Sequence, residues 1–157
     1  MTRHFGFAKR VGRLACGLLA MLLVTQAHAV FIVNLPWVLP VARGGSTEVY
    51  MDLTSTEGAT LMAATSDAAD SVSILGPGKK TKTAQSVPLP AGTLVELRPA
   101  AYRIRLQGMA HSLKLGDHMR LTLTIRSADG TQQEIPVTAE VRHHSALEDH
   151  RAQQHSH

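Results

Sequence analysis

The residue types best suited to metal chemistry gather at the C-terminal end of the chain. Residues 142–157 read RHHSALEDHRAQQHSH and hold five of the nine histidines, which are His143, His144, His150, His155 and His157. Neutral imidazole binds copper, zinc and nickel, and its affinity for metal falls as it is protonated below about pH 6.5. The cluster therefore predicts a metal-binding end of the chain, with a solvated polar end as the alternative.

A second, weaker set of candidate ligands lies in the middle of the chain and consists of Met109, His111, His118 and Met119. Thioether sulfur selects copper, above all the cuprous ion. However, neighbouring residues of a strand point to opposite faces, so His118 and Met119 are not expected to reach one ion. We therefore expect these four residues to be ordinary core or surface residues, and metal binding by them is the less favoured alternative.

Two arginines share one face of a predicted strand. In YRIRLQ (102–107), the alternation places Arg103 and Arg105 on one side and the apolar side chains on the other. A guanidinium has no lone pair for a metal, but it binds carboxylates through two parallel hydrogen bonds. With Lys80 and Lys82 expected to lie beside this face in the fold, the pattern predicts either a solvated face or a site that captures an anion or an acidic partner.

Templates for catalysis are missing from the sequence. It has no glycine-rich phosphate loop, no Gly-x-Ser-x-Gly elbow, and no motif that pairs two carboxylates for acid–base chemistry. The one cysteine, Cys16, lies in a segment that we expect to be removed. We therefore expect a binding protein, not an enzyme.

Residues 1–29 have the three parts of a secretory signal peptide. A basic start (MTRHFGFAKRVGR) precedes an apolar run (LACGLLAMLLV) and a small-x-small end (AHA). The run is too short to span a bilayer comfortably. Cys16 is not expected to carry a lipid, because Arg13 stands where a lipid-attachment motif has an aliphatic residue. We predict cleavage after Ala29, export to the periplasm and no stable membrane anchor.

Cleavage after Ala29 changes the charge balance. It removes four basic residues and leaves twelve basic and twelve acidic ones, so the mature chain is close to neutral. No basic stripe with interleaved aromatic residues remains, which argues against a nucleic-acid partner. The mature chain also has no cysteine, so it forms no disulfide and offers no thiolate ligand.

Alternation with a period of two predicts that residues 30–141 form one β domain. TEVYMDLT (47–54), MRLTLTIRS (119–127) and EIPVTAEV (134–141) each place apolar residues on one face. Asp129-Gly130 between the last two predicts a hairpin, and Pro136 favours an edge strand. Roughly eight short strands indicate an antiparallel sandwich or Greek-key barrel. Residues 142–157 are expected to form a flexible, mostly disordered tail.

Two stretches resemble the PCu(A)C family of periplasmic copper chaperones. They are LPWVLPVARGGSTEVYMDLTS (35–55) and VPLPAGTLVELRPAAYRIRLQGMAHSLKLGDHMRLTLTI (87–125), and the similarity runs from about residue 33 to residue 141. The resemblance implies a cupredoxin-like antiparallel β-sandwich with Greek-key topology. It also implies a role in handling copper.

The ligands that this resemblance implies are missing from the chain. Members of the family bind cuprous copper through two histidines and two methionines. Here Leu75 stands at the first histidine, the loop GPGKKTKTAQS (76–86) has no methionine, and Arg103 and Arg105 stand at a His-x-Met pair.

Two functions therefore remain open, besides a purely structural sandwich. The first is an exported copper-chaperone-like protein whose histidine-rich tail holds copper, zinc or nickel. It would serve a donor or acceptor such as an oxidase assembly factor. The second is a non-metal binding module that uses the basic face.

Overall fold

The structure, a computed structural model, describes residues 30–78 and 82–144, and every regular element in them is a strand. Nine strands are present, against roughly eight expected: β1 (Phe31–Val38), β2 (Ser46–Ser55), β3 (Ala59–Thr65), β4 (Ala69–Leu75), β5 (Val87–Leu89), β6 (Leu94–Leu97), β7 (Arg103–Met109), β8 (His118–Ser127) and β9 (Gln132–Val141). The predicted all-β class is confirmed.

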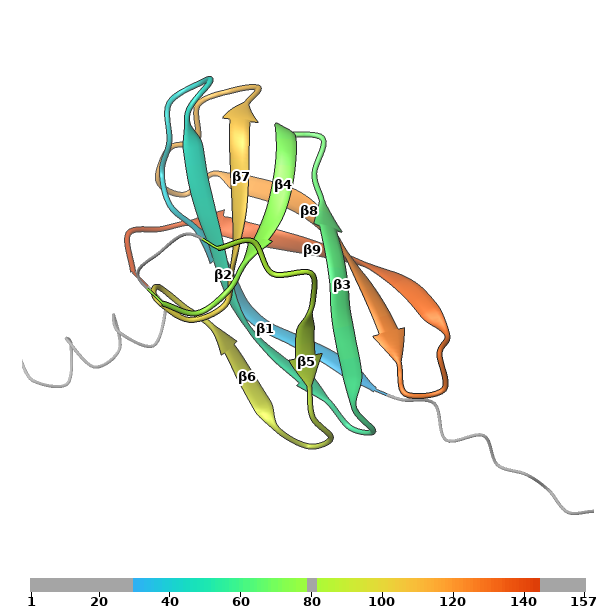
Figure 1. Ribbon diagram of the computed structural model, residues 1–157. Coiled ribbons are helices and arrows are strands. Elements are labelled where there is room, and N and C mark those ends of the chain that lie inside the picture. Colours follow the sequence, from blue (N-terminus) through green and yellow to red (C-terminus); the bar gives the residue numbers. More distant parts are fainter. Residues whose placement is uncertain (1–29, 79–81, 145–157) are drawn as a thin grey trace, which may run out of the picture.

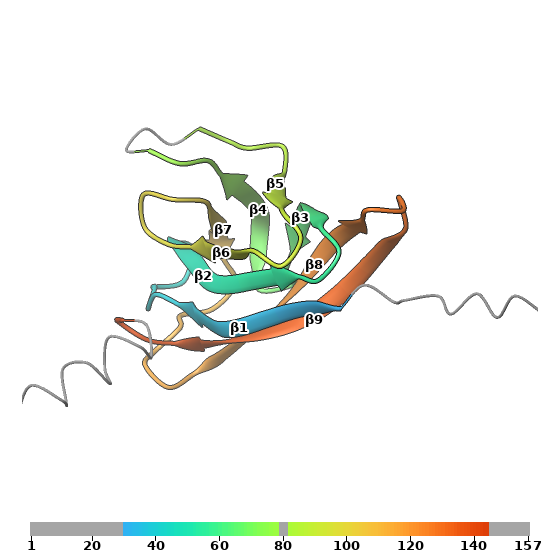
Figure 2. The same ribbon diagram turned by 90° about the horizontal axis from the view of Figure 1, so that it is seen from below.

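The strands form one hydrogen-bonded sheet that curls into a sandwich. Their order is β4-β7-β2-β1-β9-β8-β3-β5, and β6 pairs with β2 outside this path. In Figure 1, β8 and β9 pass behind β7 and β4, and Figure 2 shows β1 and β9 on one side of the domain with β4 and β5 on the other. All strand pairs are antiparallel except β1 with β9.

The predicted inward faces form the core between the two halves of the sheet. In β2 and β8, Val49, Leu53, Leu123 and Ile125 are completely buried, in agreement with the alternation. Burial of such a side chain contributes about 1.5–3 kcal/mol. Few aromatic residues are needed, because aliphatic side chains from all nine strands fill or border this space.

The opposite face of β2 is also largely covered, which alternation alone did not indicate. Tyr50 and Asp52 are buried although they alternate with the core residues Val49, Met51 and Leu53. Trp37 of β1 packs on Tyr50, with ring centroids 4.6 Å apart. Polar side chains on this face are therefore held in a partly dry environment.

The hairpin predicted at Asp129-Gly130 is confirmed. The backbone N–H of Ser127 donates to the carbonyl of Thr131 over 2.8 Å, and Gly130 has a φ of +87°. That left-handed conformation is readily available to glycine and costly for most other residues. The turn aligns β8 and β9 along nine residue pairs, from His118–Glu140 to Arg126–Gln132.

The expectation that Pro136 marks an edge strand is wrong for β9 as a whole. β9 lies between β8 and β1 in the sheet. Its parallel pairing with β1, however, is confined to Trp37–Glu140 and Val38–Val141, so it stops before Pro136 is reached. The missing N–H of proline is tolerated there because the ladder with β1 does not extend that far.

Within residues 30–78 and 82–144, no helix has the length and apolarity needed to cross a membrane. The segment expected to be a signal peptide lies outside the described residues.

Candidate functional site

Three of the four positions at which the PCu(A)C resemblance implies copper ligands are brought together by the pairing of β4 with β7. Leu75 lies directly opposite Arg103, and Ser73 lies opposite Arg105. Leu75 is only 2% exposed. An aliphatic and two cationic side chains therefore stand where lone-pair donors would be required, and none of them can bind a metal ion.

Arg103 is a buried cation with three hydrogen-bond acceptors. Its Nε donates to Oε1 of Glu48 over 3.2 Å, and its Nη1 donates to the carbonyls of Gly76 and Ala101 over 3.2 and 3.0 Å. The residue is 6% exposed. Its guanidinium thus ties β7 to β2, to the chain after β4 and to the turn before β7.

Glu48 neutralises part of the predicted basic face. It accepts from Nη2 of Arg105 over 2.8 Å and from the hydroxyl of Tyr50 over 2.7 Å, in addition to Arg103. Burial opposes ionisation of Glu48, but the hydrogen bonds from Tyr50, Arg105 and Arg103 outweigh it and lower the pKa of the carboxyl. Burial and the bond to Glu48 raise the pKa of Tyr50.

The residues of the predicted basic face differ in how far they are open to solvent, and capture of a partner by this face stays a prediction. Arg103 is 6% exposed and already donates to Glu48, Gly76 and Ala101, so little of it is open to a partner. Arg105 keeps 27% of its side chain exposed, and Lys82 is exposed. Lys80 lies outside the described residues.

The second set of candidate ligands is not brought together by the fold. Met109 and Met119 are core residues, each 2% exposed, whereas His111 and His118 face solvent. His118 and Met119 point to opposite sides of β8, as expected from strand geometry. Among the described residues, no three His, Cys, Asp or Glu side chains are arranged to hold a metal ion.

His143 and His144 are exposed and lie one residue beyond the end of β9, after Arg142. Their ring centroids are 6.1 Å apart. They border a hollow of about 430 Å³ whose other lining residues are Leu115, Gly116, Glu140, Val141 and Arg142. His150, His155 and His157 lie outside the described residues.

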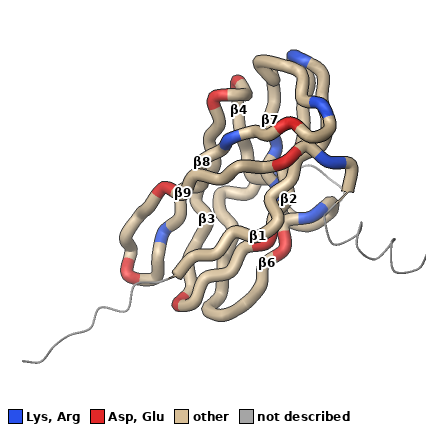
Figure 3. Tube along the Cα trace, turned by 180° about the vertical axis from the view of Figure 1, so that it is seen from behind, with Lys and Arg blue, Asp and Glu red and all other residues tan. Residues whose placement is uncertain are grey.

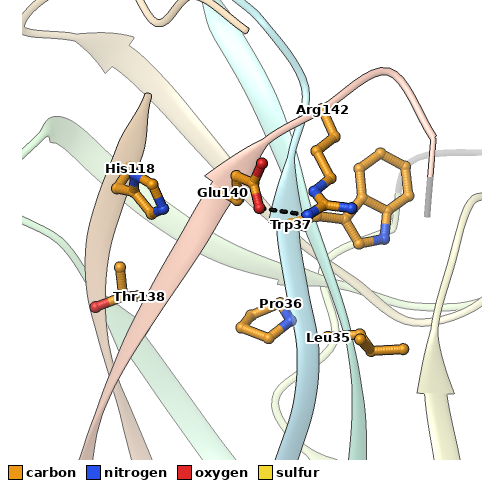
Figure 4. A pocket seen from close by; sticks show the side chains of 7 residues that line it. All are labelled: Leu35, Pro36, Trp37, His118, Thr138, Glu140 and Arg142. Carbon is orange, nitrogen blue, oxygen red and sulfur yellow. Dashed lines mark hydrogen bonds and ion pairs between the residues drawn. The ribbon is translucent and has the colours of Figure 1, made fainter. Parts of the chain in front are cut away.

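A neighbouring pocket of about 300 Å³ shares Glu140 and Arg142 with this hollow (Figure 4). Its wall combines apolar and polar side chains: Leu35, Pro36, Trp37, His118, Thr138, Glu140 and Arg142. Arg142 donates to Glu140, and this hydrogen bond lowers the pKa of the Glu140 carboxyl. His118 lies directly opposite Glu140 in the β8–β9 register.

Sequence reasoning missed the contribution of Trp37, Glu140 and Arg142 to this end of the sheet. The i, i+2 spacing of Glu140 and Arg142 could have indicated a pair on one face of a strand. The approach of Trp37 could not have been found in that way, because it depends on the parallel pairing of β1 with β9.

Acidic and basic residues both occur throughout the described part of the chain. Figure 3 shows acidic and basic residues interspersed along the strands, without a continuous basic stripe. This distribution agrees with the equal numbers of basic and acidic residues after residue 29.

Solved structures with similar folds are PCuAC domains. The apo PCuAC domain from PmoF1 superposes with a TM-score of 0.62 at 22% identity, covering 73% of this chain and 98% of that domain. The copper-bound PCuAC domain from PmoF2 gives 0.59 at 18% identity, with 74% and 98% covered. The cuprous form of DR1885 from Deinococcus radiodurans gives 0.55 at 23% identity, with 75% and 83% covered.

The fold is therefore that of a PCuAC-type β domain, and the resemblance found in the sequence is confirmed. Residues 31–137 also match the family described as "Putative lipoprotein LpqE-like". The chain belongs to this LpqE-like family. A comparison with curated proteins gave no match. The family description names a lipoprotein, whereas the absence of a lipid on Cys16 stays a prediction, because Cys16 lies outside the described residues.

Proposed function

We propose that this protein is an exported, copper-chaperone-like domain that binds and carries copper in the periplasm. The metal is held by histidines at the C-terminal end, beginning with His143 and His144. The carrier exchanges its copper with a donor or acceptor protein, such as an oxidase assembly factor. A cleavable signal peptide at residues 1–29 delivers it to that compartment.

The observation that carries this proposal is the contrast between two positions in one PCuAC-type domain. At the β4–β7 position, Arg103 is buried against Glu48 and two carbonyl groups, so a metal is repelled and finds no donor. At the end of β9, two imidazoles are exposed. Solved domains with the same fold include copper-bound and cuprous forms, which supports copper as the metal.

The distance between the rings of His143 and His144 suits a metal ion with few ligands. A bond from a metal to an imidazole nitrogen is about 2 Å long. Two rings whose centroids are 6.1 Å apart can therefore share one ion only if they approach it from nearly opposite sides. Such an arrangement leaves the ion open to a further ligand from the partner, as transfer requires. Zinc and nickel are the competing metals for the same imidazoles.

Metal titration of the chain from Val30 onward tests the proposal. Cuprous copper is added without oxygen, and cupric copper, zinc and nickel are added in air, each against a chromophoric chelator. We expect copper to be taken from the chelator at pH 7.5. We expect its affinity to fall as the pH drops below about 6.5, because protonated imidazole has no lone pair for a metal.

Matched variants assign the ligands. His143→Asn with His144→Asn should weaken copper binding at least about tenfold, as the loss of metal ligands does, and removal of residues 145–157 should weaken it further. His111→Asn removes an exposed histidine elsewhere and should change nothing. Failure of the full chain to compete with the chelator would end the proposal. If both the double variant and the chain without residues 145–157 bound copper with full affinity, the C-terminal histidines would not be the ligands.

A further inference from the structure

A small hollow beside Arg105 is separate from the histidine-bearing end of the sheet. It measures about 260 Å³ and is lined by Leu39, Pro40, Ser46, Thr47, Glu48 and Arg105. The lining residues come from the start of β2 and from the chain just after β1, with Arg105 contributed by the adjacent strand β7. The hollow therefore has one apolar wall and one hydrogen-bonding wall.

The charges around this hollow do not cancel. Arg103 and Arg105 both donate to Oε1 of Glu48, and among the described residues neither cation has another acidic partner. Two guanidiniums and one carboxylate leave one positive charge. Because Arg103 is enclosed, that charge is presented to the hollow by Arg105, whose side chain is 27% exposed.

The unused hydrogen-bond donors around the hollow also favour an anionic ligand. Within the described chain, Arg105 uses Nη2 for Glu48, and its other N–H groups have no protein acceptor. Thr47 is already engaged, since its hydroxyl donates to the carbonyl of Leu39. Ser46 is exposed and its hydroxyl is available. A guanidinium edge and a hydroxyl therefore line the open volume, beside the Glu48 carboxylate that already accepts from Arg103, Arg105 and Tyr50.

We propose that the hollow beside Arg105 binds a carboxylate group. The planar fork of Arg105 takes the carboxylate oxygens, Ser46 adds a hydroxyl donor, and Leu39 and Pro40 contact the carbon chain that bears the carboxylate. A single negative charge matches the single excess positive charge. A phosphate dianion fits less well, because its second charge would lie against Glu48.

The carboxylate has two sources, a free organic acid or an Asp or Glu side chain of a protein partner, and the chemistry of recognition is the same for both. This site does not depend on copper or on the histidines. Carboxylate binding can therefore be tested independently of the proposed copper binding.

Nuclear magnetic resonance titration tests the proposal directly on the chain from Val30 onward. The Nε–Hε signal of Arg105 and the amide signals of Ser46 and Thr47 are followed during addition of sodium acetate, with sodium chloride at equal ionic strength as the reference. We expect acetate to cause chemical-shift changes of these signals that saturate. Chloride should not cause the same saturable changes. Succinate and a short glutamate-containing peptide then compare a free acid with a protein side chain. Tighter binding of the peptide would identify a partner's side chain as the source.

Variants of Arg105 and Ser46 test whether these side chains bind the carboxylate. Arg105→Gln should weaken acetate binding at least about tenfold, and Arg105→Lys, which keeps the charge but loses the fork, should weaken it by a smaller factor. Arg126→Gln, at an exposed arginine of β8, is the matched control. Ser46→Ala provides a second test if Arg105→Gln folds poorly. Shifts that do not saturate, that chloride reproduces, or that phosphate produces at lower concentration would overturn the proposal.

Discussion

At the scale of single residues, Arg103 and Glu48 decide what the β4–β7 position can do. A buried charge is costly unless it is paired and hydrogen-bonded, and Arg103 meets both conditions through Glu48 and two carbonyl groups. The same contacts that make the arginine acceptable in the interior exclude a metal. The absence of metal ligands at this position is therefore a stable arrangement of the fold.

Replacement of Glu48 by Gln should destabilise the protein in a pH-dependent way. The folded-state pKa of Glu48 is lower than its ordinary value near 4.5, so the ionised carboxylate stabilises the fold above that pH and the stabilisation is lost as the pH falls. We expect Glu48→Gln to lower the free energy of unfolding by about 2 kcal/mol at pH 7. The difference from the unmodified protein should shrink toward pH 3.

Urea unfolding at pH 7, 5 and 3 measures this difference. Glu134→Gln, at an exposed position of β9, is the control and should lose little at any pH. A loss for Glu48→Gln that stays the same at all three values of pH would contradict the role assigned to the ionised carboxylate.

At the scale of elements, the β8–β9 hairpin sets which side chains meet at the histidine-bearing end. Its register places His118 opposite Glu140, and the short parallel pairing with β1 brings Trp37 to the other side of Glu140. A shift of one residue would turn every side chain of β9 to the opposite face. The turn at Gly130 is therefore structurally linked to a site at the far end of the two strands.

Gly130→Ala should reduce stability by about 1 kcal/mol, because alanine is strained at a φ of +87°. The loss is conformational, since a Cβ at this position meets no atom within 4 Å. Gly130→Asn should lose less, because asparagine tolerates the left-handed region better than alanine. Thermal unfolding of the two variants compares them, and equal losses would contradict this explanation.

At the scale of the whole molecule, aliphatic packing and satisfied hydrogen bonds hold the described domain together. Its core is a continuous aliphatic cluster, and every buried side-chain nitrogen and oxygen of the described residues has a hydrogen-bond partner. The proposed metal ligands are close together in sequence, so they are available in the unfolded chain as well. A metal that binds both states equally does not stabilise the folded one.

The melting temperature of the chain from Val30 onward should therefore be insensitive to metal. Addition of a strong chelator should leave it unchanged, and copper should shift it only slightly. Removal of residues 145–157 should also leave it unchanged, because the last contact of β9, from the N–H of Arg142 to the carbonyl of Val38, is kept. A clear fall with chelator, measured by calorimetry, would indicate a metal inside the sandwich.

The sequence alone was sufficient for the all-β class, the inward faces of β2 and β8 and the Asp129-Gly130 hairpin. It also determined that residues 75, 103 and 105 offer no metal ligand. These features depend on local alternation, turn chemistry and residue identity. Only the tertiary structure decided that Arg103 is enclosed while Arg105 is open, and that His118, Glu140 and Trp37 meet. Arg103 and its counter-ion Glu48 are 55 residues apart in sequence, and no local pattern specifies such a pairing, because it depends on which strands become neighbours in the sheet.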